Sequence, residues 1–452
     1  MAGARRLPHS HGMASIDMTS EARGAMLRGG GLPPSSMKVC LLTTMQPSLN
    51  PRLVKEADTL TAAGMDVTVV YAYMMDWASR ADADLFQSRS WKAVQAGGNP
   101  RDRRLSFHYT RLRYRAGREI LGLVPGRLAP VNWALSRITC ELIKAAKQIP
   151  ADLYIAHNLG ALPAAIAGAR KHGARAGFDA EDFHSDMVLA ADRMPVDALA
   201  AEVEAACLPE CAYVTAASPA MAQAYARKYR IDRPTPILNV FPLEDRPHQF
   251  RPTNPSGPLR LYWFSQTIGK DRGLEDAIRA MGILGTPDVE LYLQGQWAAG
   301  YRKEIETLAA AAGLDRRQIV HLPLEAPSEV VRRASAYDVG LALEQAKSQN
   351  RDVTITNKLF TYILAGNAVA ATITAGQKPV IDRIGAAGTC YAPGDAEGLA
   401  RCLDPWLRDR SALDSSRRLS WEWGTRVYNW GVDKSKFLDV IQHALARPMS
   451  HA

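Results

Sequence analysis

The chain has 452 residues, of which 47% are hydrophobic and 22% are charged, and its formal net charge is +9 at pH 7. This composition is typical of a globular protein large enough for two domains, and it argues against extensive intrinsic disorder. No run approaches the roughly 18 apolar residues of a membrane span, and the N-terminus lacks the apolar core of a signal peptide. Because the six cysteines are also scattered, we expect reduced thiols in a cytoplasmic protein.

Residues 1–36 are rich in Gly, Ser, Pro and Arg and show no hydrophobic period, which predicts a disordered leader. Further on, the segment from Arg101 to Arg118 contains seven arginines and one acidic residue, Asp102. Two interpretations are open: a solvated face, or a peripheral contact with acidic membrane lipids or a phosphorylated acceptor. Nucleic acid is not expected as a partner, because no recognition motif accompanies the charge.

From residue 37, short apolar runs alternate with helical patterns, which predicts parallel sheets with crossover helices. In the first half, strands are predicted over 38–44, 66–72, 152–158, 175–180, 211–218 and 236–241, and helices over 51–64, 160–173 and 219–230, with a further helix ending near Cys207. We therefore expect a Rossmann-like domain over 37–241. A proline-rich stretch without periodicity predicts an interdomain linker over 242–258.

The second half repeats this alternation and predicts another Rossmann-like domain over 259–415. Its strands are predicted over 259–265, 289–295, 319–324, 338–344 and 389–392, its helices over 274–285, 301–313, 327–337, 377–388 and 395–407, and a helix followed by a buried strand within 356–372. The aromatic tail, 416–452, is expected to be helical and to cross the domain junction; the alternative is an ordinary surface helix. The fold class is thus α/β, with two doubly wound domains facing across a cleft beyond the carboxyl ends of their strands.

Most familiar nucleotide and hydrolase fingerprints are absent: there is no Walker A sequence, no GxGxxG after a strand, no HExxH and no GxSxG. The loop TIGKDRG after the strand at 259–265 nevertheless suits a diphosphate. Gly269 and Gly273 free its backbone, while Lys270 and Arg272 bring positive charge to the end of the strand. The alternative is a solvated turn, in which these residue types are common.

A second candidate for anion binding is the helix in TNKLFTYILAG. Thr356 is a suitable N-cap and Gly366 a suitable C-terminal stop, yet Lys358 lies in the first turn, where the helix dipole disfavours a cation. A bound phosphate would explain the lysine, because the ammonium and the free N–H groups would both face negative charge. The alternative is a lysine that extends into water.

The second half resembles the nucleotide-sugar-binding domain of GT-B glycosyltransferases, in particular retaining glycosyltransferase family 4, also called glycosyl transferases group 1. The similarity rests on FSQTIGKDRGLEDAI, LYLQG, YDVGLALE and NKLFTYILAGNAV. In the first half, NPRLVKEADTLTAAGMDVTVV, DLYIAHN, FDAEDFH, AYVTAAS and ILNV match more weakly. The resemblance spans 37–407, and NKLFTYILAGNAV is its most specific motif.

The resemblance implies a donor site in the second half. It places Arg272, with Gly273 beside it, at the family's donor-phosphate lysine, and it places Asn357 and Lys358 over the phosphates. The family's paired glutamates fall on Thr361 and Val353, so both carboxylates are missing. Thr361 could still hydrogen-bond a ribose. Glu344, or alternatively Asp352, is the candidate acidic group toward the donor sugar, and Ser265-Gln266-Thr267 replaces the family's Gly-Arg.

In the first half, the resemblance places His157 against the transferred sugar as a catalytic residue; the alternative is a structural histidine. Asp179, Glu181, Asp182 and His184 are candidates for acceptor binding.

The implied activity is transfer of a sugar from a nucleoside diphosphate donor to a glycan, lipid-linked or small-molecule acceptor, with retention. No metal and no cofactor are expected, the nucleotide sugar being the co-substrate. Two alternatives remain: a non-hydrolysing sugar-nucleotide epimerase of the same architecture, and a non-catalytic relative that binds a nucleotide or glycan.

Overall fold

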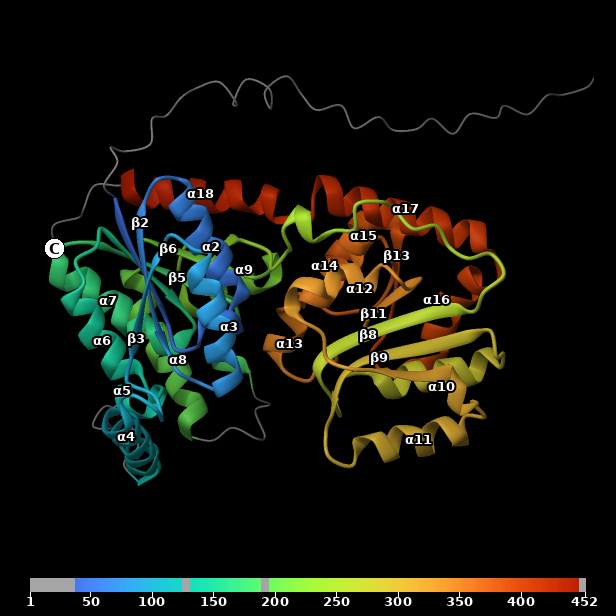
Figure 1. The fold of residues 1–452 in the computed structure, drawn as a ribbon, viewed down its shortest axis with the longest axis horizontal. Coiled ribbons are helices and arrows are strands. Elements are labelled where there is room, and N and C mark those ends of the chain that lie inside the picture. The colour runs from blue at the N-terminus through green and yellow to red at the C-terminus, as the bar shows by residue number, and fades with distance from the viewer. Residues whose placement is uncertain (1–36, 124–130, 188–194, 447–452) are drawn as a thin grey trace, which may run out of the picture.

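The computed structural model describes residues 37–123, 131–187 and 195–446, which form two α/β domains side by side (Figure 1). The first contains a sheet of seven strands in the order β3-β2-β1-β4-β5-β6-β7. Its strands are β1 (Lys38–Thr43), β2 (Asp66–Ala72), β3 (Lys92–Ala96), β4 (Leu153–His157), β5 (Arg175–Ala180), β6 (Tyr213–Ala216) and β7 (Thr235–Pro236). Every strand pair is parallel, so all carboxyl ends meet at one edge of the sheet.

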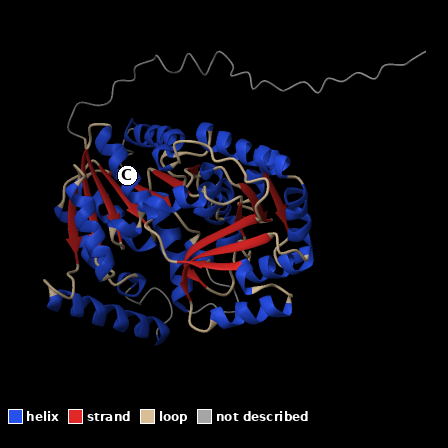
Figure 2. Ribbon diagram, turned by 45° about the vertical axis from the view of Figure 1, so that its right-hand side comes forward, coloured by secondary structure: helices blue, strands red, loops and turns tan. Residues whose placement is uncertain are grey.

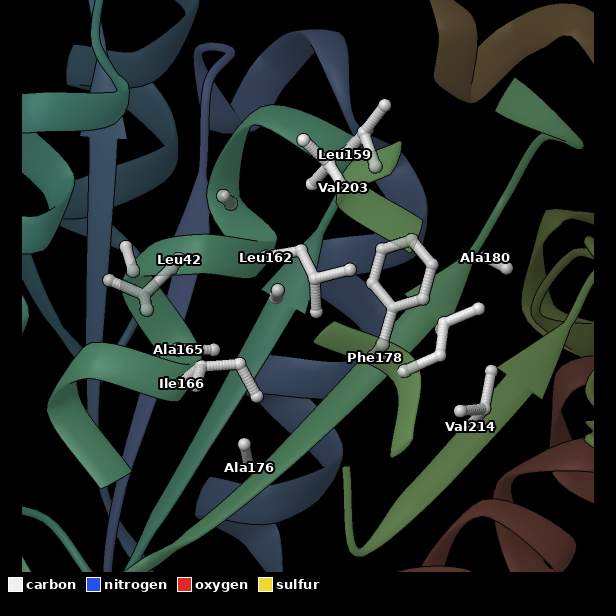
Figure 3. Packing of buried hydrophobic residues seen from close by; sticks show 14 of the residues in the cluster. Leu42, Leu159, Leu162, Ala165, Ile166, Ala176, Phe178, Ala180, Val203 and Val214 are labelled. Atoms are coloured by element: carbon white, nitrogen blue, oxygen red, sulfur yellow. The ribbon is translucent and has the colours of Figure 1, made fainter. Parts of the chain in front are cut away.

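Helices cover both faces of this sheet (Figure 2). They are α2 (Pro51–Ala62), α3 (Asp76–Gln87), α4 (Arg104–Leu123), α5 (Val131–Leu135), α6 (Thr139–Gln148), α7 (Leu162–His172), α8 (Pro195–Cys207) and α9 (Pro219–Tyr229). Because both faces are covered, β4 is buried along its whole length, as expected for a central parallel strand. Figure 3 shows one face of the core, where Phe178 of β5 packs among Leu162 of α7 and Val203 of α8.

The second domain has six parallel strands in the order β10-β9-β8-β11-β12-β13. They are β8 (Leu259–Ile268), β9 (Val289–Trp297), β10 (Ile319–Leu322), β11 (Val339–Ala342), β12 (Ala368–Thr372) and β13 (Gly388–Tyr391). Its helices are α10 (Leu274–Leu284), α11 (Tyr301–Ala311), α12 (Val330–Ala334), α13 (Gln349–Val353), α14 (Asn357–Ala365), α15 (Lys378–Ile384) and α16 (Ala396–Arg408). The predicted fold class, two doubly wound α/β domains, is therefore confirmed.

Two further helices, α17 (Arg410–Arg426) and α18 (Trp430–Ala446), lie along one side of both domains (Figure 1). α17 packs on α14 of the second domain, whereas α18 packs on α2 of the first. There, the indole N–H of Trp430 donates to the hydroxyl of Thr59, 3.1 Å away, and Asp433 accepts a hydrogen bond from the backbone of Leu238. The C-terminal segment thus contacts both domains.

The structure adds details that the sequence pattern did not supply. The basic segment, to which periodicity assigned no element, contains most of α4. The strand expected over 236–241 is only the two-residue β7, Thr235–Pro236. The predicted leader, 1–36, lies outside the described residues. None of the described helices is both long and apolar enough to cross a membrane.

Candidate active site

A cavity of about 560 Å³ lies between the two domains, at the carboxyl ends of both sheets. Its volume is in the usual range of small-molecule sites. The first domain contributes Ser48, Asn50, Arg52, Trp77, Glu181, Asp182 and Asn239, among others. The second contributes Phe264, Ser265, Gln266, Thr267, Arg272, Gln294, Glu325, Glu344 and the run from Thr354 to Lys358. We call this space the cleft cavity.

The loop between β8 and α10 brings Arg272 into the cleft cavity. Arg272 forms no ion pair with any described residue, so its charge is available to a ligand. Gly273 is needed beside it: its φ is 73°, and a Cβ there would lie 2.6 Å from the carbonyl oxygen of Leu343. Lys270 points elsewhere, since its ammonium pairs with Glu304 of α11 at 2.8 Å. Lys270, Gly269 and Gly273 do not line the cavity.

At the start of α14, Lys358 is buried and its ammonium lies 2.8 Å from the Glu344 carboxylate. Burial opposes ionisation of Glu344, but Lys358, with Arg272 and Arg351 nearby, outweighs it and lowers the pKa of that carboxyl. The first turn of α14 has no side-chain cap, because the Thr356 hydroxyl finds no hydrogen-bond partner. Lys358, Glu344 and this uncapped turn all border the cleft cavity.

The two other predicted donor residues on α14 have different surroundings. Asn357 is exposed and lines the cleft cavity. Thr361 is fully buried, and its hydroxyl donates to the carbonyl of Asn357, 2.9 Å away, one turn earlier. Of the alternative carboxylates, Asp352 accepts a hydrogen bond from the backbone of Ala375 and does not line the cavity. The structure thus brings Arg272, Glu344, Asn357 and Lys358 together at the cleft cavity. Thr361 and Asp352 do not line it.

His157 ends β4 and is fully buried within a cluster of charged side chains. Its Nε2 lies 3.1 Å from the Glu56 carboxylate, and its Nδ1 lies 3.2 Å from Glu181 and 3.4 Å from Asp179. Burial would lower the pKa of His157, but Glu56, Glu181 and Asp179 raise it to about 10. The ring is therefore an imidazolium at neutral pH. His157 does not line the cleft cavity; its neighbour Glu181 does.

Arg52 of α2 completes this cluster. Its guanidinium donates twice to Asp179 and once to the carbonyl of Ile237, 2.6 Å away. Burial opposes the charge of Asp179, yet Arg52 and His157 lower the pKa of that carboxyl. Arg52 and His157 thus already contact the carboxylates of Asp179 and Glu56, and His157 would have to release a proton before it could bind a metal ion. Arg52 and Glu56 were missed at the sequence level, where PRLVKEADTL indicates only an amphipathic helix.

The predicted acceptor residues separate into three places. Asp179 belongs to the buried cluster. Glu181 lines the cleft cavity, where Asn50 donates to its Oε1 over 2.7 Å, and Asp182 lines it as well. His184 borders a different cavity in the first domain.

The short helix α13 of the second domain forms hydrogen bonds with the first domain. Asn350 donates to the Asp182 carboxylate over 3.0 Å and accepts from the backbone of Phe183 over 2.7 Å. The hydroxyl of Ser218 donates to the carbonyl of Val353, whose side chain packs with the hydrophobic core of the first domain. These contacts fix the facing walls of the cleft cavity relative to each other.

No family model matches the chain, and no curated protein sequence matches it either. Solved structures do. HepE from Anabaena, solved in complex with UDP, superposes with a TM-score of 0.64 at 15% identity, over 90% of this chain and 100% of that one. The chain has the GT-B fold.

Two further GT-B structures agree over similar lengths. Sucrose-phosphate synthase from Thermosynechococcus elongatus gives a TM-score of 0.66 at 14% identity, over 91% of this chain and 99% of that one. TarM from S. aureus, solved with UDP, gives a TM-score of 0.64 at 10% identity, over 91% of this chain and 100% of that one. The GT-B neighbours include glycosyltransferases, and some were solved with UDP or UDP-glucose.

Proposed function

We propose that the protein is a glycosyltransferase that binds a nucleoside diphosphate sugar in the cleft cavity. The observation that supports this most directly is the pairing of Arg272, which has no ion-pair partner among the described residues, with the uncapped first turn of α14. A guanidinium and free backbone N–H groups bordering one cavity favour a diphosphate. The UDP complexes of the GT-B neighbours are consistent with this donor class.

The chemical requirement is to stabilise a departing diphosphate. As the bond between the anomeric carbon and the phosphate oxygen breaks, negative charge develops on that oxygen, while the acceptor hydroxyl forms the new bond and releases its proton. Arg272, Lys358 and the first N–H groups of α14 are fixed donors for that charge, so the proposal needs no metal ion. The expected retention at the anomeric carbon belongs to the same proposal and follows from the family resemblance.

Glu344 and His157 have supporting roles in this proposal. Glu344 fixes the Lys358 ammonium at 2.8 Å and borders the cavity on the side of the donor. His157 is fully buried, so we propose that it positions Glu181 instead of touching the sugar. Glu181, held by Asn50 as well, then presents its carboxylate to the sugar or the acceptor.

Thermal stabilisation by UDP-, GDP- and ADP-sugars tests the donor site, because a ligand that binds only the folded state raises Tm. We expect one of these donors to raise Tm. Arg272→Ala should weaken that donor about tenfold or more, the usual loss for a hydrogen bond to a charged group. Lys270→Ala is the matched control from the same loop, since its ammonium contacts Glu304. The assignment fails if no donor stabilises the protein, or if both variants behave alike.

We also propose that the protein meets anionic membrane lipid through α4. Apolar side chains recur along its outer side at helical spacing, and they are unusually exposed, with Leu105 at 89%, Leu112 at 68% and Leu123 at 80%. At about 100° per residue, Arg104, Arg111, Arg115 and Arg118 share the adjacent side. An exposed apolar stripe flanked by arginines is typical of helices that lie in the lipid headgroup region.

Cosedimentation with vesicles tests this contact. We expect binding to phosphatidylcholine vesicles that contain phosphatidylglycerol, and weaker binding to phosphatidylcholine alone. Leu105→Ser combined with Leu112→Ser should reduce the binding, whereas Leu419→Ser, at an exposed leucine of α17, should not. Equal binding of all three proteins would exclude α4 as the lipid contact.

A further inference from the structure

A second cavity, of about 870 Å³, lies in the first domain. Thr44, Asn158 and His184, which follow β1, β4 and β5, line it. The cleft cavity uses Ser48 and Glu181, which follow β1 and β5 as well. The two cavities therefore both lie along the carboxyl edge of one sheet, and no described residue lines both of them. We call the second one the α4 cavity, because α4 forms one of its walls.

The α4 cavity is strongly positive. Arg111, Arg115 and Arg137 line it, against one carboxylate, Asp197, among the described lining residues. Arg111 and Arg115 form no ion pair with any described residue. Arg113, on the same helix, differs, because it is buried and its guanidinium donates to Glu141 over 2.8 Å. The available charge of α4 therefore faces this cavity and the solvent.

Hydrogen bonds fix the position of Arg137 in the lining of the α4 cavity. Its guanidinium donates to the carbonyl of Tyr73 over 2.7 Å and to the hydroxyl of Thr110 over 2.9 Å. Burial lowers the pKa of Arg137, and the nearby guanidinium groups of Arg111 and Arg113 lower it further, although Glu141 acts in the opposite direction. An anion between these groups would relieve their repulsion. The Nε2 of His184, also buried, finds no hydrogen-bond partner.

Much of the remaining lining is apolar or aromatic. It includes Phe107, Leu135, Leu159, Leu199, Tyr73, Met74 and Met187. A purely anionic ligand would leave this surface unused, and a purely apolar one would leave the guanidinium groups of Arg111 and Arg115 without an anionic partner. The lining fits a molecule with both parts.

We propose that the α4 cavity binds an amphiphile that bears a phosphate, with the phosphate between Arg111, Arg115 and Arg137 and the apolar part along Phe107 and the leucines. We assign it as the acceptor site, because the segments that follow β1 and β5 line both this cavity and the cleft cavity. The acceptor role rests on the proposed glycosyltransferase function; the ligand class rests on the lining alone.

Calorimetric titration of the full-length chain with dihexanoyl phosphatidic acid, a water-soluble phosphate amphiphile, tests the ligand class. We expect saturable binding, weaker binding of inorganic phosphate, and weaker binding of dihexanoylglycerol, which lacks the phosphate. Arg111→Ala and Arg115→Ala should each weaken the phosphatidic acid by about tenfold or more. Arg227→Ala, at an exposed arginine of α9 that lies outside the cavity lining and away from α4, is the matched control and should have no such effect.

Three results would overturn the proposal: no binding of phosphatidic acid to the unaltered chain, equal affinity for inorganic phosphate, or unchanged affinity in the Arg111→Ala and Arg115→Ala variants. Thermal stabilisation by nucleotide sugars, measured on the same proteins, separates this result from the proposed function. We expect both variants to keep it. Failure of all nucleotide sugars with the unaltered chain would remove the glycosyltransferase assignment, while the titration alone decides the ligand of the α4 cavity.

Discussion

Lys358 has both a structural and a functional role in this proposal, and paired substitutions can separate them. Its ammonium and the Glu344 carboxylate are 2.8 Å apart, and the two side chains are only 8% and 10% exposed. Lys358→Met would leave Glu344 as a buried, unpaired carboxylate. Breaking a buried pair on one side costs about 3–5 kcal/mol, whereas replacing both partners by neutral groups of similar size is often nearly neutral.

We therefore expect Lys358→Met to lower the free energy of unfolding by about 3–5 kcal/mol, and Lys358→Met combined with Glu344→Gln to recover most of that loss. Urea denaturation measures both. The double variant should nevertheless bind the nucleotide sugar about tenfold or more weakly, because the phosphate contact is absent. If the double variant is as stable as the unaltered protein and binds the donor equally well, Lys358 does not contact the phosphates. If Lys358→Met alone is fully stable, the ion pair is not structural.

Three further predictions concern residues that support the cleft cavity and α4. The pKa of His157 is raised from 6.5 to about 10 in the folded state. The ionised ring therefore contributes its full share of the free energy of unfolding below pH 6.5, and this share is lost as the pH rises toward 10. His157→Gln should flatten this part of a profile of unfolding free energy against pH, measured in urea. Gly273→Ala should lower Tm and donor affinity together, because φ is 73° and the new Cβ would meet Leu343; unchanged affinity would place the loop outside the donor site. Arg113→Ala should destabilise the fold by about 1–3 kcal/mol through its lost bonds to Glu141, and Arg111→Ala should not, as thermal denaturation would show.

The fold class followed from the sequence because the core strands are continuous apolar runs, such as LYIAH in β4, separated by helices with clear stop signals such as Gly173 and Gly366. α4 could not be recognised in the same way. Its outward side repeats Leu105, Tyr109 and Leu112 while its inward side includes Arg113, so apolar residues do not mark the buried side. A helix whose exposed side is the more apolar one gives a misleading hydrophobic period.

Part of the candidate site was also accessible from the sequence. Arg272, Asn357, Lys358 and Glu344 do border one cavity. The glycine-rich loop and the helix dipole were sufficient to propose Arg272 and Lys358, whereas Asn357 and Glu344 were proposed from the family resemblance. The destination of Lys270 was not predictable, because its partner Glu304 lies on α11, more than thirty residues away. The pairing of Arg52 with Asp179 likewise joins residues 127 positions apart. The sequence of α2 does not reveal whether an arginine at this position is buried or solvated.

The segment from Asn350 to Lys358 links the interface between the domains to the donor side of the cleft. Asn350 and Val353 contact the first domain, and four residues after Val353 the chain enters α14, whose first turn borders the cleft cavity. A separation of the domains that broke the contacts of Asn350 would therefore pull on the same short stretch that positions Lys358. Binding of the donor and separation of the domains are then coupled equilibria. A donor that favours one domain spacing shifts the spacing by the same free energy by which that spacing shifts donor binding.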